Sequence, residues 1–476
     1  MENINPKKKK LHIAMFPWLA FGHIMPFLHL SKLIAHKGHN ISFLSTPLNI
    51  DRLLSSSDDD ISMIHFVKLP FRPHPNLPHN AQATADVTYK QVHYLFQSFD
   101  WLQDDIALFL ENSKPDWIIQ DFASHWLGPI AHRLGTRCAH FSVYKATTMI
   151  NIPPPKELCG FKDYRTRPED YTKPPKWIPF PSNLAFHLHE IHRIFDNMEP
   201  DNTGTSPYDR VKGVVLHSDT ILVRSCYELE SKWLTLMQTL YRKPVVPVGL
   251  LPAPSSNDND DGDKTWKPIK AWLDKQKKGS VVYVAFGSET KLSQSELTEL
   301  ALGLEMSQQP FFWALMTNRG PTDDEPVVLP KGFEDRVGKH CMVSTKHCMV
   351  STSWVPQLKI LSHGSVSGLL FHSGWSTVIE AVQFGKSMVV LPLQSDQPLV
   401  ARFLEAEQLG YCLPRDEKDG SFTREAVAAA IKLVLSDEGG RVYREKVMEM
   451  KGLFADMKKQ DMYVESILEH LLHVVE

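Results

Sequence analysis

The sequence predicts an α/β protein with two doubly wound domains, each built on a parallel sheet. Short apolar segments alternate with segments of helical length along most of the chain, a pattern typical of strand–helix–strand units. The 476 residues exceed what one hydrophobic core usually supports. A polar, acidic stretch, Ala253–Thr265, interrupts the alternation and indicates a linker between the two domains.

The first half of the chain is predicted to open with a buried strand, Leu11–Pro17, and a helix, His23–Gly38. Further strands are predicted at Asn40–Thr46, Ser62–Pro70, Asp116–Asp121, Arg137–Val143 and Ile221–Cys226. In doubly wound sheets, ligands bind beyond the carboxyl ends of the strands. Polar residues that directly follow a strand are therefore candidates for a site.

Two strand-to-helix turns in the second half have the features of an anion site. A strand that begins at Val281 leads into a Phe-Gly-Ser bend that contains Gly287. The predicted strand Gly368–Phe371 leads into a Gly-containing turn and a helix that Gly385 ends. A helix N-terminus offers free backbone N–H groups and the positive end of a dipole. We therefore expect these turns to bind a diphosphate without a metal ion.

The heptapeptide KHCMVST occurs twice in tandem, at Lys339–Thr345 and Lys346–Thr352. The repeated His and Cys do not indicate a metal site, because the duplication itself accounts for both pairs. We expect the second copy to form the strand that leads to Trp354, and the first copy to form a surface loop.

Composition argues against several classes of protein. The net charge is −3 and no arginine-rich patch occurs, so nucleic acid is not an expected partner. No apolar run has the length of a membrane span, and no signal-peptide pattern follows the first Met. The 6 cysteines lack the spacing of a disulfide scaffold, which fits a reducing compartment. We expect a cytoplasmic protein that is a monomer.

His23 and Asp121 each lie just past a predicted strand. A helix N-terminus disfavours a charged imidazole, so His23 is expected to be neutral and able to accept a proton. A carboxylate on its other ring nitrogen would fix the tautomer and stabilise the charged form. The pair would then be a general base for a hydroxyl group. On spacing alone, a helix-capping histidine and a solvated aspartate explain the two residues equally well.

The segment Trp354–Gln397 holds groups suited to a base, a ribose, a diphosphate and a sugar. It contains an aromatic residue, an amide, an imidazole, a Gly-Trp-Ser-Thr turn, a carboxylate and a terminal Asp-Gln pair. Taken singly, each residue is better explained as a helix cap, a core histidine or a core tryptophan. All of them at this spacing indicate a site for a nucleotide sugar.

The same segment resembles the C-terminal signature box of plant UDP-dependent glycosyltransferases, family 1, which have the GT-B fold. The box begins with W-x-P-Q and ends with D-Q, and its length fits without a gap. The resemblance implies that Trp354 stacks on uracil, that Val355 holds the base through its backbone, and that Gln357 and Glu380 bind the ribose. It implies diphosphate contacts from Gly287, Ser288, His372, Gly374, Ser376 and Thr377, and sugar contacts from Trp375, Asp396 and Gln397.

The resemblance extends over nearly the whole chain. The G-H-x-x-P element at Gly22, His23 and Pro26 looks like the catalytic histidine turn of the family, and Asp121 matches its partner aspartate. Contacts with the acceptor are expected from Phe21, Gly22 and Tyr144. The usual Asn of the H-C-G-W-N-S string is Ser376 here, as in the sub-group that extends sugar chains already attached to small molecules.

The family architecture implies the domain boundaries. Residues 1–252 are expected to form an acceptor-binding domain, 253–265 a linker, 266–455 a UDP-sugar-binding domain, and 456–476 a helix that packs back on the first domain. The two sheets of this GT-B fold are expected to face each other across a cleft. The proline-rich segments Asn151–Phe161 and Thr172–Pro181 are expected to form loops over the acceptor pocket.

These expectations describe an inverting, metal-independent UDP-glycosyltransferase that needs no cofactor. UDP-glucose is the expected donor, because Gln397 closes the box as in family glucosyltransferases, and UDP-rhamnose is the alternative. The expected acceptor is a plant specialised metabolite that already carries a sugar, such as a flavonoid or terpenoid glycoside. A non-catalytic module that binds nucleotide sugars is the alternative of another class, and the presence of both His23 and Asp121 argues against it.

Overall fold

The computed structural model describes residues 9–56, 61–195, 200, 203–253, 264–287, 292–315, 328–333 and 348–475. The chain forms two compact units. The first comprises Met1–Asp163, Asn197–Leu251 and Met457–Glu476, and the second comprises Tyr164–Asp196 and Pro252–Asp456. This division differs from the expected boundaries in one segment, because residues 164–196 pack in the second unit rather than the first.

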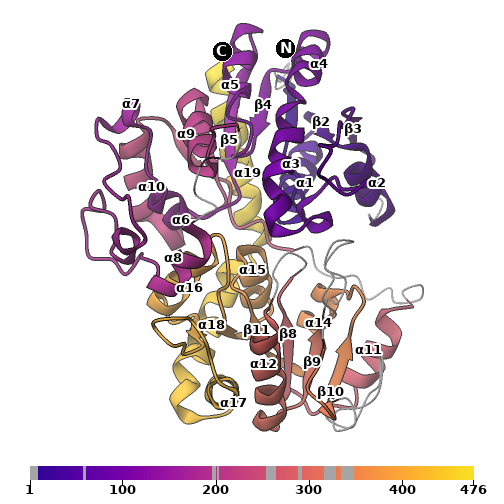
Figure 1. Cartoon of the computed structure of the whole chain (residues 1–476). Helices are drawn as coiled ribbons and strands as arrows, with labels where there is room; N and C mark the ends of the chain where they lie inside the picture. The colour runs from indigo at the N-terminus through magenta and orange to yellow at the C-terminus, as the bar shows by residue number, and fades with distance from the viewer. Residues whose placement is uncertain are drawn as a thin grey trace, which may run out of the picture. The chain divides into compact units, whose positions relative to one another are not determined.

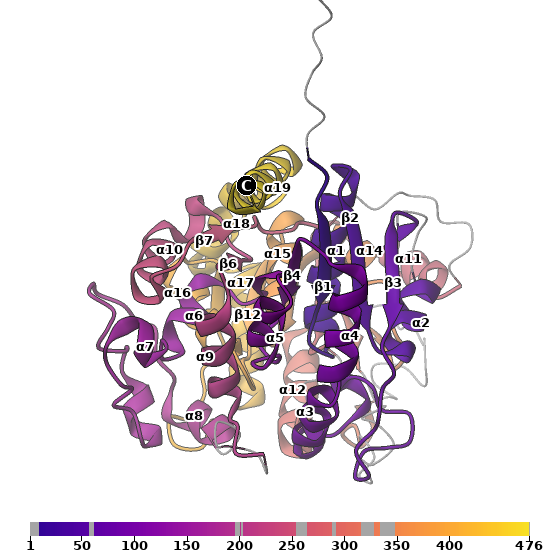
Figure 2. The same cartoon turned by 90° about the horizontal axis from the view of Figure 1, so that it is seen from above.

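The first unit contains a parallel sheet of seven strands in the order β3-β2-β1-β4-β5-β6-β7. Figure 2 shows β3, β2 and β1 next to one another at one edge of this sheet. All six strands predicted for the first half are confirmed. The strands are β1 His12–Phe16, β2 Asn40–Ser45, β3 Ile64–Lys68, β4 Trp117–Gln120, β5 Arg137–Ser142, β6 Thr220–Val223 and β7 Val245–Pro247.

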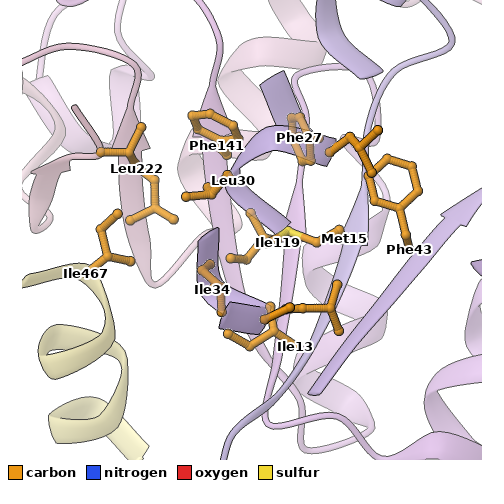
Figure 3. Packing of buried hydrophobic residues seen from close by; sticks show 14 of the residues in the cluster. Ile13, Met15, Phe27, Leu30, Ile34, Phe43, Ile119, Phe141, Leu222 and Ile467 are labelled. Atoms are coloured by element: carbon orange, nitrogen blue, oxygen red, sulfur yellow. The ribbon is translucent and has the colours of Figure 1, made fainter. Parts of the chain in front are cut away.

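Helices cover this sheet and complete its core. They are α1 Phe21–His36, α2 Pro47–Ser56, α3 Val92–Asp100, α4 Gln103–Ser113, α5 Leu127–Arg133, α6 Ala146–Asn151, α7 Lys156–Cys159, α9 Pro207–His217, α10 Tyr227–Tyr241 and α19 Met457–Val475. Figure 3 shows Phe27 and Leu30 of α1 packed with Ile13, Ile119 and other strand residues. The strands are mostly apolar because helices bury both faces of a parallel sheet, and Gln120, His140 and Ser142 are buried polar residues within them.

The last helix, α19, packs on the first unit. Its apolar side chains belong to the core of that unit, and Figure 3 shows Ile467 near Leu222 of β6. The indole Nε1 of Trp117 donates to the backbone oxygen of Leu471 at 3.2 Å. Burial of this apolar face is what attaches the end of the chain to the first unit.

The second unit contains a parallel sheet of six strands in the order β10-β9-β8-β11-β12-β13 (Figure 1). The strands are β8 Val281–Ala285, β9 Phe311–Ala314, β10 Cys348–Ser351, β11 Val366–Phe371, β12 Ser387–Val390 and β13 Gly410–Cys412. The helices are α8 Leu188–Phe195, α11 Trp266–Leu273, α12 Gln294–Ser307, α14 Gln357–Ser362, α15 Trp375–Gln383, α16 Gln397–Ala406, α17 Arg424–Leu435 and α18 Arg441–Phe454.

The second copy of KHCMVST forms strand β10, which pairs with β9 as a parallel edge strand. The prediction for this copy is therefore confirmed. The first copy, Lys339–Thr345, lies outside the residues that the structure describes.

Helix α8 lies in residues 164–196, the segment from the first half of the chain that packs in the second unit. In Figure 1, α8 lies close to α16. Glu190 of α8 accepts from Arg402 of α16 at 2.9 Å, and both side chains are buried. Arg193 donates to Glu296 of α12 at 3.0 Å.

Among the helices that the structure describes, each is too short or too polar to cross a membrane.

Candidate functional site

In each sheet, two candidate residues follow the two strands between which the strand order changes direction. The strand order changes direction between β1 and β4 in the first sheet, and between β8 and β11 in the second. His23 and Asp121 follow β1 and β4, while Gly287 and His372 follow β8 and β11. Such a switch point is where ligands bind in open α/β sheets. Each unit therefore presents its candidate residues at the expected edge.

His23 and Asp121 form a buried hydrogen-bonded pair. The Nδ1 atom of His23 lies 2.8 Å from Oδ2 of Asp121, and Asp121 is only 1% exposed. Helix α1 begins at Phe21 after Ala20, so His23 lies inside the first turn and does not cap it. The alternatives of a helix-capping histidine and a solvated aspartate are therefore both excluded.

The carboxylate of Asp121 is held by donors from two strand ends. The backbone N–H of Trp18 donates to Oδ2 at 3.0 Å, and that of Phe122 donates to Oδ1 at 2.7 Å. Burial would raise the pKa of Asp121, but the charge and hydrogen bond of His23 and these two amides hold that pKa below its ordinary value. Asp121 is therefore ionised at neutral pH and can stabilise a protonated His23.

Tyr144, one of the expected acceptor residues, contacts His23. It lies between β5 and α6, and its hydroxyl oxygen is 3.4 Å from Nε2 of His23. The two rings meet edge-on, with centroids 5.4 Å apart. Phe21 has the guanidinium of Arg52 5.9 Å from its ring centroid, and Gly22 is exposed.

In the second unit, two glycines make room for the imidazole of His372. Gly287 has a φ of +72°, and a Cβ added there would lie 3.1 Å from Cε1 of His372. A Cβ added at Gly374 would lie 2.7 Å from Nε2 of the same ring. Both positions therefore need glycine for His372 to keep its place beside the helix that follows.

Helix α15 begins beside this imidazole, and its N-cap residue has no side chain that could cap it. Its N-cap is Gly374, so Trp375, Ser376 and Thr377 form the first turn. The explanation of Ser376 or Thr377 as a helix cap is therefore wrong. Burial lowers the pKa of His372 to about 4, against a weaker opposing effect of the Ala285 backbone. A neutral imidazole and the N-terminus of a helix are suited to donating hydrogen bonds to a phosphate.

Gln357 and Glu380 form a prearranged pair next to this turn. Nε2 of Gln357 donates to Oε2 of Glu380 at 2.7 Å and lies 3.3 Å from Oγ1 of Thr377. The hydroxyl of Tyr283 on β8 donates to Oε1 of Gln357 at 3.2 Å. The two expected ribose residues thus lie on neighbouring helices, with their polar ends together.

Trp354 is 71% exposed, which excludes the explanation of a core tryptophan. An indole exposed to this extent beside a buried residue, Val355, presents a flat surface on which an aromatic base can stack. Trp354 precedes α14, the helix that carries Gln357. The residue expected to stack on the base therefore lies directly before the helix that carries one of the residues expected to bind the ribose.

The three residues expected to contact the sugar differ in their burial and in their hydrogen bonds. The indole of Trp375 is buried edge-on against Phe403 and Phe454, so a contact with a sugar would have to come from its backbone. Asp396 is the N-cap residue of α16. Oε1 of Gln397 accepts from the backbone N–H groups of residues 393 and 394, both at 3.0 Å. The amide oxygen of Gln397 is thus bound to the backbone of the preceding turn.

Sequence reasoning missed residues that hold the site together through hydrogen bonds within the protein. Trp18, Phe122 and Tyr283 act through the hydrogen bonds described above, and Ser373 ties His372 to α16 through a 2.8 Å hydrogen bond to the backbone oxygen of Gln397. The partners of Trp18, Tyr283 and Ser373 are distant in the chain, and the backbone N–H of Phe122, which donates to its neighbour Asp121, carries no side-chain signal. Ser288 lies outside the described residues, and within them no group of three His, Cys, Asp or Glu could hold a metal ion.

Comparison with known proteins gives one consistent result. Residues 214–470 match the model of a family described as UDP-glucoronosyl and UDP-glucosyl transferase. UDP-glycosyltransferase 91A1 of Arabidopsis thaliana is 51% identical over 97% of this chain and 97% of that protein. Soyasaponin III rhamnosyltransferase of Glycine max is 38% identical over 97% of this chain and 96% of that protein.

A solved structure has the same fold. The structure of Glycyrrhiza uralensis UGT73P12, complexed with glycyrrhetinic acid 3-O-monoglucuronide, superposes with a TM-score of 0.78 at 21% identity. The match covers 98% of this chain and 96% of that one.

Proposed function

The chain belongs to the UDP-glucoronosyl and UDP-glucosyl transferase family, and on that premise we propose that it transfers glucose from UDP-glucose to a hydroxyl group of a plant glycoside. As a family member it is a UDP-glycosyltransferase of the GT-B fold, with two Rossmann-like units. In this proposal the first unit binds the acceptor and the second unit binds the UDP-sugar.

The observation that carries the proposal is the buried hydrogen bond between His23 and Asp121. Because Asp121 occupies Nδ1, the neutral imidazole has Nε2 as its basic nitrogen. Nε2 takes the proton of the acceptor hydroxyl, whose oxygen attacks the anomeric carbon from the face opposite the diphosphate. The bond from that carbon to the diphosphate oxygen breaks with its electron pair, and the sugar is transferred with inversion.

The second unit supplies the binding of UDP and the stabilisation of the leaving group. Trp354 stacks on uracil, Val355 holds it through its backbone, and the pair of Gln357 and Glu380 binds the ribose hydroxyls. The N-terminus of α15 and His372 donate to the diphosphate, where negative charge develops as UDP leaves. These donors carry the charge without requiring a metal ion.

The names of related proteins support a glycoside acceptor and keep a second donor open. The Glycyrrhiza protein of the same fold was solved with glycyrrhetinic acid 3-O-monoglucuronide, which is itself a glycoside. Two relatives are named rhamnosyltransferases, and one of these names specifies an anthocyanidin 3-O-glucoside. UDP-rhamnose is therefore the second candidate donor, while glucose rests on Gln397 at the end of the donor segment.

A donor and acceptor screen tests the proposal. The protein is incubated with UDP-glucose or UDP-rhamnose, with and without flavonoid and terpenoid glycosides, and UDP release and product mass are measured. We expect acceptor-dependent UDP release and the gain of one hexose. Gain of a deoxyhexose would establish the second donor, and absence of transfer to every acceptor would contradict the proposal.

We further expect a cytoplasmic monomer, which size-exclusion chromatography and a fluorescent fusion would test.

A further inference from the structure

A wholly buried ion pair lies directly after Tyr144 in the first unit. Nζ of Lys145 is 3.3 Å from Oε1 of Glu230, and both side chains are 0% exposed. Lys145 is the N-cap residue of α6, and Glu230 lies in the first turn of α10, at a backbone conformation that departs from the helix. Two charges removed from water in this way contribute little net stability, because desolvation offsets their attraction.

The carboxylate of Glu230 joins two loops at the same edge of the sheet. It accepts from the backbone N–H groups of Ala146 at 3.1 Å and Thr147 at 2.9 Å. It also accepts from the hydroxyl of Ser225 at 2.6 Å. Ser225 follows β6, and Lys145 follows its neighbour β5. One carboxylate thus fixes the chain directly after Tyr144 to the end of the next strand.

Glu230 is ionised in the folded protein. Burial would raise the pKa of Glu230, but the charge of Lys145 and the donors Ser225 and Thr147 hold that pKa below its ordinary value. Nζ of Lys145 also donates to Oγ1 of Thr147 at 2.5 Å. The turn at residues 144–147 is therefore held by both members of the pair.

The other end of Tyr144 faces the proposed base. Its hydroxyl lies 3.4 Å from Nε2 of His23, the nitrogen that takes the proton of the acceptor. Its backbone oxygen accepts from the hydroxyl of Ser142 at 2.9 Å. A hydroxyl at this distance from Nε2 can form a hydrogen bond with an oxygen of the acceptor beside the one that loses its proton.

We propose that Glu230 and Lys145 are positioning residues that hold the hydroxyl of Tyr144 beside Nε2 of His23, so that Tyr144 selects which hydroxyl of the acceptor sugar is glycosylated. This inference rests on the proposed function. It assigns Tyr144 to specificity, and it assigns the buried pair to the geometry of Tyr144 rather than to overall stability.

A double-mutant cycle tests the inference. Tyr144→Phe, Glu230→Gln and the double variant are assayed with UDP-glucose and a flavonol 3-O-glucoside, whose sugar offers several hydroxyl groups. Tyr144→Phe is expected to lower kcat/KM for the glucoside about 3- to 10-fold, as for one lost hydrogen bond, and to change the ratio of product isomers. Glu230→Gln is expected to change the ratio in the same direction, and to have less than about 2-fold further effect in the Tyr144→Phe background.

The outcomes separate this inference from the proposed function. Ser225→Ala, which removes one hydrogen bond of the carboxylate, provides a milder variant in case Glu230→Gln does not fold. UDP affinity should be unchanged in all variants, because these residues belong to the first unit. An unchanged isomer ratio in Glu230→Gln and Ser225→Ala, or equal losses of kcat/KM in both Tyr144 backgrounds, would overturn the positioning role. Failure of the unmodified protein to glycosylate any acceptor would instead contradict the proposed function.

Discussion

The Nδ1 atom of His23 and the Oδ2 atom of Asp121 are 2.8 Å apart, although 98 residues separate them in the sequence. They meet because β1 and β4, the strands that precede them, are neighbours where the strand order changes direction. Both residues follow the carboxyl ends of those strands, where ligands bind in sheets of this kind. The topology of the sheet therefore assembles the proposed base.

Asp121→Asn should lower kcat about 100-fold or more while UDP affinity stays unchanged. The NH2 group of the amide cannot accept a hydrogen bond, so either the backbone N–H of Phe122 or the N–H groups of Trp18 and His23 lose their acceptor, and the negative charge is lost in either case. The neutral tautomer and the charged form of His23 both lose their support, and general-base catalysis contributes about 10²- to 10⁴-fold. Steady-state kinetics and UDP titration calorimetry measure the two quantities.

Asp116→Asn is the matched control for this variant. Asp116 precedes the same strand, β4, and accepts the backbone N–H of His12 at 2.8 Å. It therefore ties β4 to β1 as Asp121 does, but at the opposite end of the strand. Equal losses of kcat in the two variants would show that Asp121 acts only through the structure of the sheet.

Glu380→Ala should remove the preference of the protein for UDP over 2′-deoxy-UDP. Hydrogen bonds from ribose hydroxyls to a carboxylate contribute about 1.5–3 kcal/mol, so UDP affinity should fall about 10- to 100-fold while the deoxy analogue loses less. Calorimetry with both nucleotides gives the result. Glu299→Ala, which removes a carboxylate paired with Arg424 in the same unit, should leave both affinities unchanged. Retention of the ribose preference would remove Glu380 from the site.

The strands could be predicted from the sequence, whereas the packing of residues 164–196 could not. Parallel strands buried on both faces are continuous apolar runs, so Leu11–Pro17 and Asp116–Asp121 were recognisable without any partner. The attachment of α8 depends on Glu190 and Arg402, which are 212 residues apart. Neither residue carries a local signal that it will be buried as a pair, and only the assembled unit brings them together.

The parts of the candidate site that could be predicted from the sequence are those whose residues lie close together in the chain. His372 and Gly374 follow a strand within one short segment, so the turn could be identified from spacing. The burial of the Trp375 indole depends on Phe403 and Phe454, and the tie from Ser373 depends on α16. These contacts are made by tertiary packing, which the spacing of residues within one segment does not encode.

Gly287→Ala should weaken UDP binding about 10-fold by displacing His372. The new Cβ would lie 3.1 Å from Cε1 of the imidazole, and the φ of +72° is unfavourable for alanine by about 1–2 kcal/mol. Gly279→Ala is the control, because Gly279 has a φ of +67° but nothing within 4 Å of an added Cβ. Both variants should lose similar stability, measured by urea denaturation. Equal loss of UDP affinity would mean that backbone strain alone is responsible.

Stability should fall as the pH decreases from about 6.5 to about 4, in part because of His140. Burial lowers the pKa of His140 from 6.5 to about 4, despite the nearby charge of Asp121. Over this range the unfolded chain binds a proton that the folded chain does not, so unfolding becomes easier as pH falls. One such group contributes a slope of up to about 1.4 kcal/mol per pH unit, which disappears below the lowered pKa.

His140→Gln should reduce this slope by about one proton. Glutamine can still donate to the backbone oxygen of Gln120, which lies 3.3 Å from Nδ1 of His140. The free energy of unfolding of both proteins is measured in urea between about pH 4.5 and 7, the range in which the pKa shift acts. Because the slopes are compared, a loss of stability that is the same at every pH does not affect the result. Identical slopes would show that His140 is not buried in its neutral form.

Ser373→Ala should raise KM for the UDP-sugar about 5-fold while changing UDP affinity less. The hydroxyl of Ser373 donates to the backbone oxygen of Gln397 at 2.8 Å, so it connects the turn after β11 to the start of α16. A neutral hydrogen bond contributes about 0.5–1.5 kcal/mol, which corresponds to about 2- to 12-fold. The loss should concern the sugar, since Gln397 is the residue proposed to contact it.

Ser373→Gly separates this connection from the backbone conformation. Ser373 has a φ of +64°, a left-handed conformation that favours glycine, so the glycine variant should be more stable than the alanine variant by about 1 kcal/mol. Both variants lack the hydroxyl and should show the same increase in KM for the UDP-sugar. If KM instead follows stability, and the glycine variant behaves like the unmodified protein, then the conformation of the turn matters and the hydrogen bond to Gln397 does not.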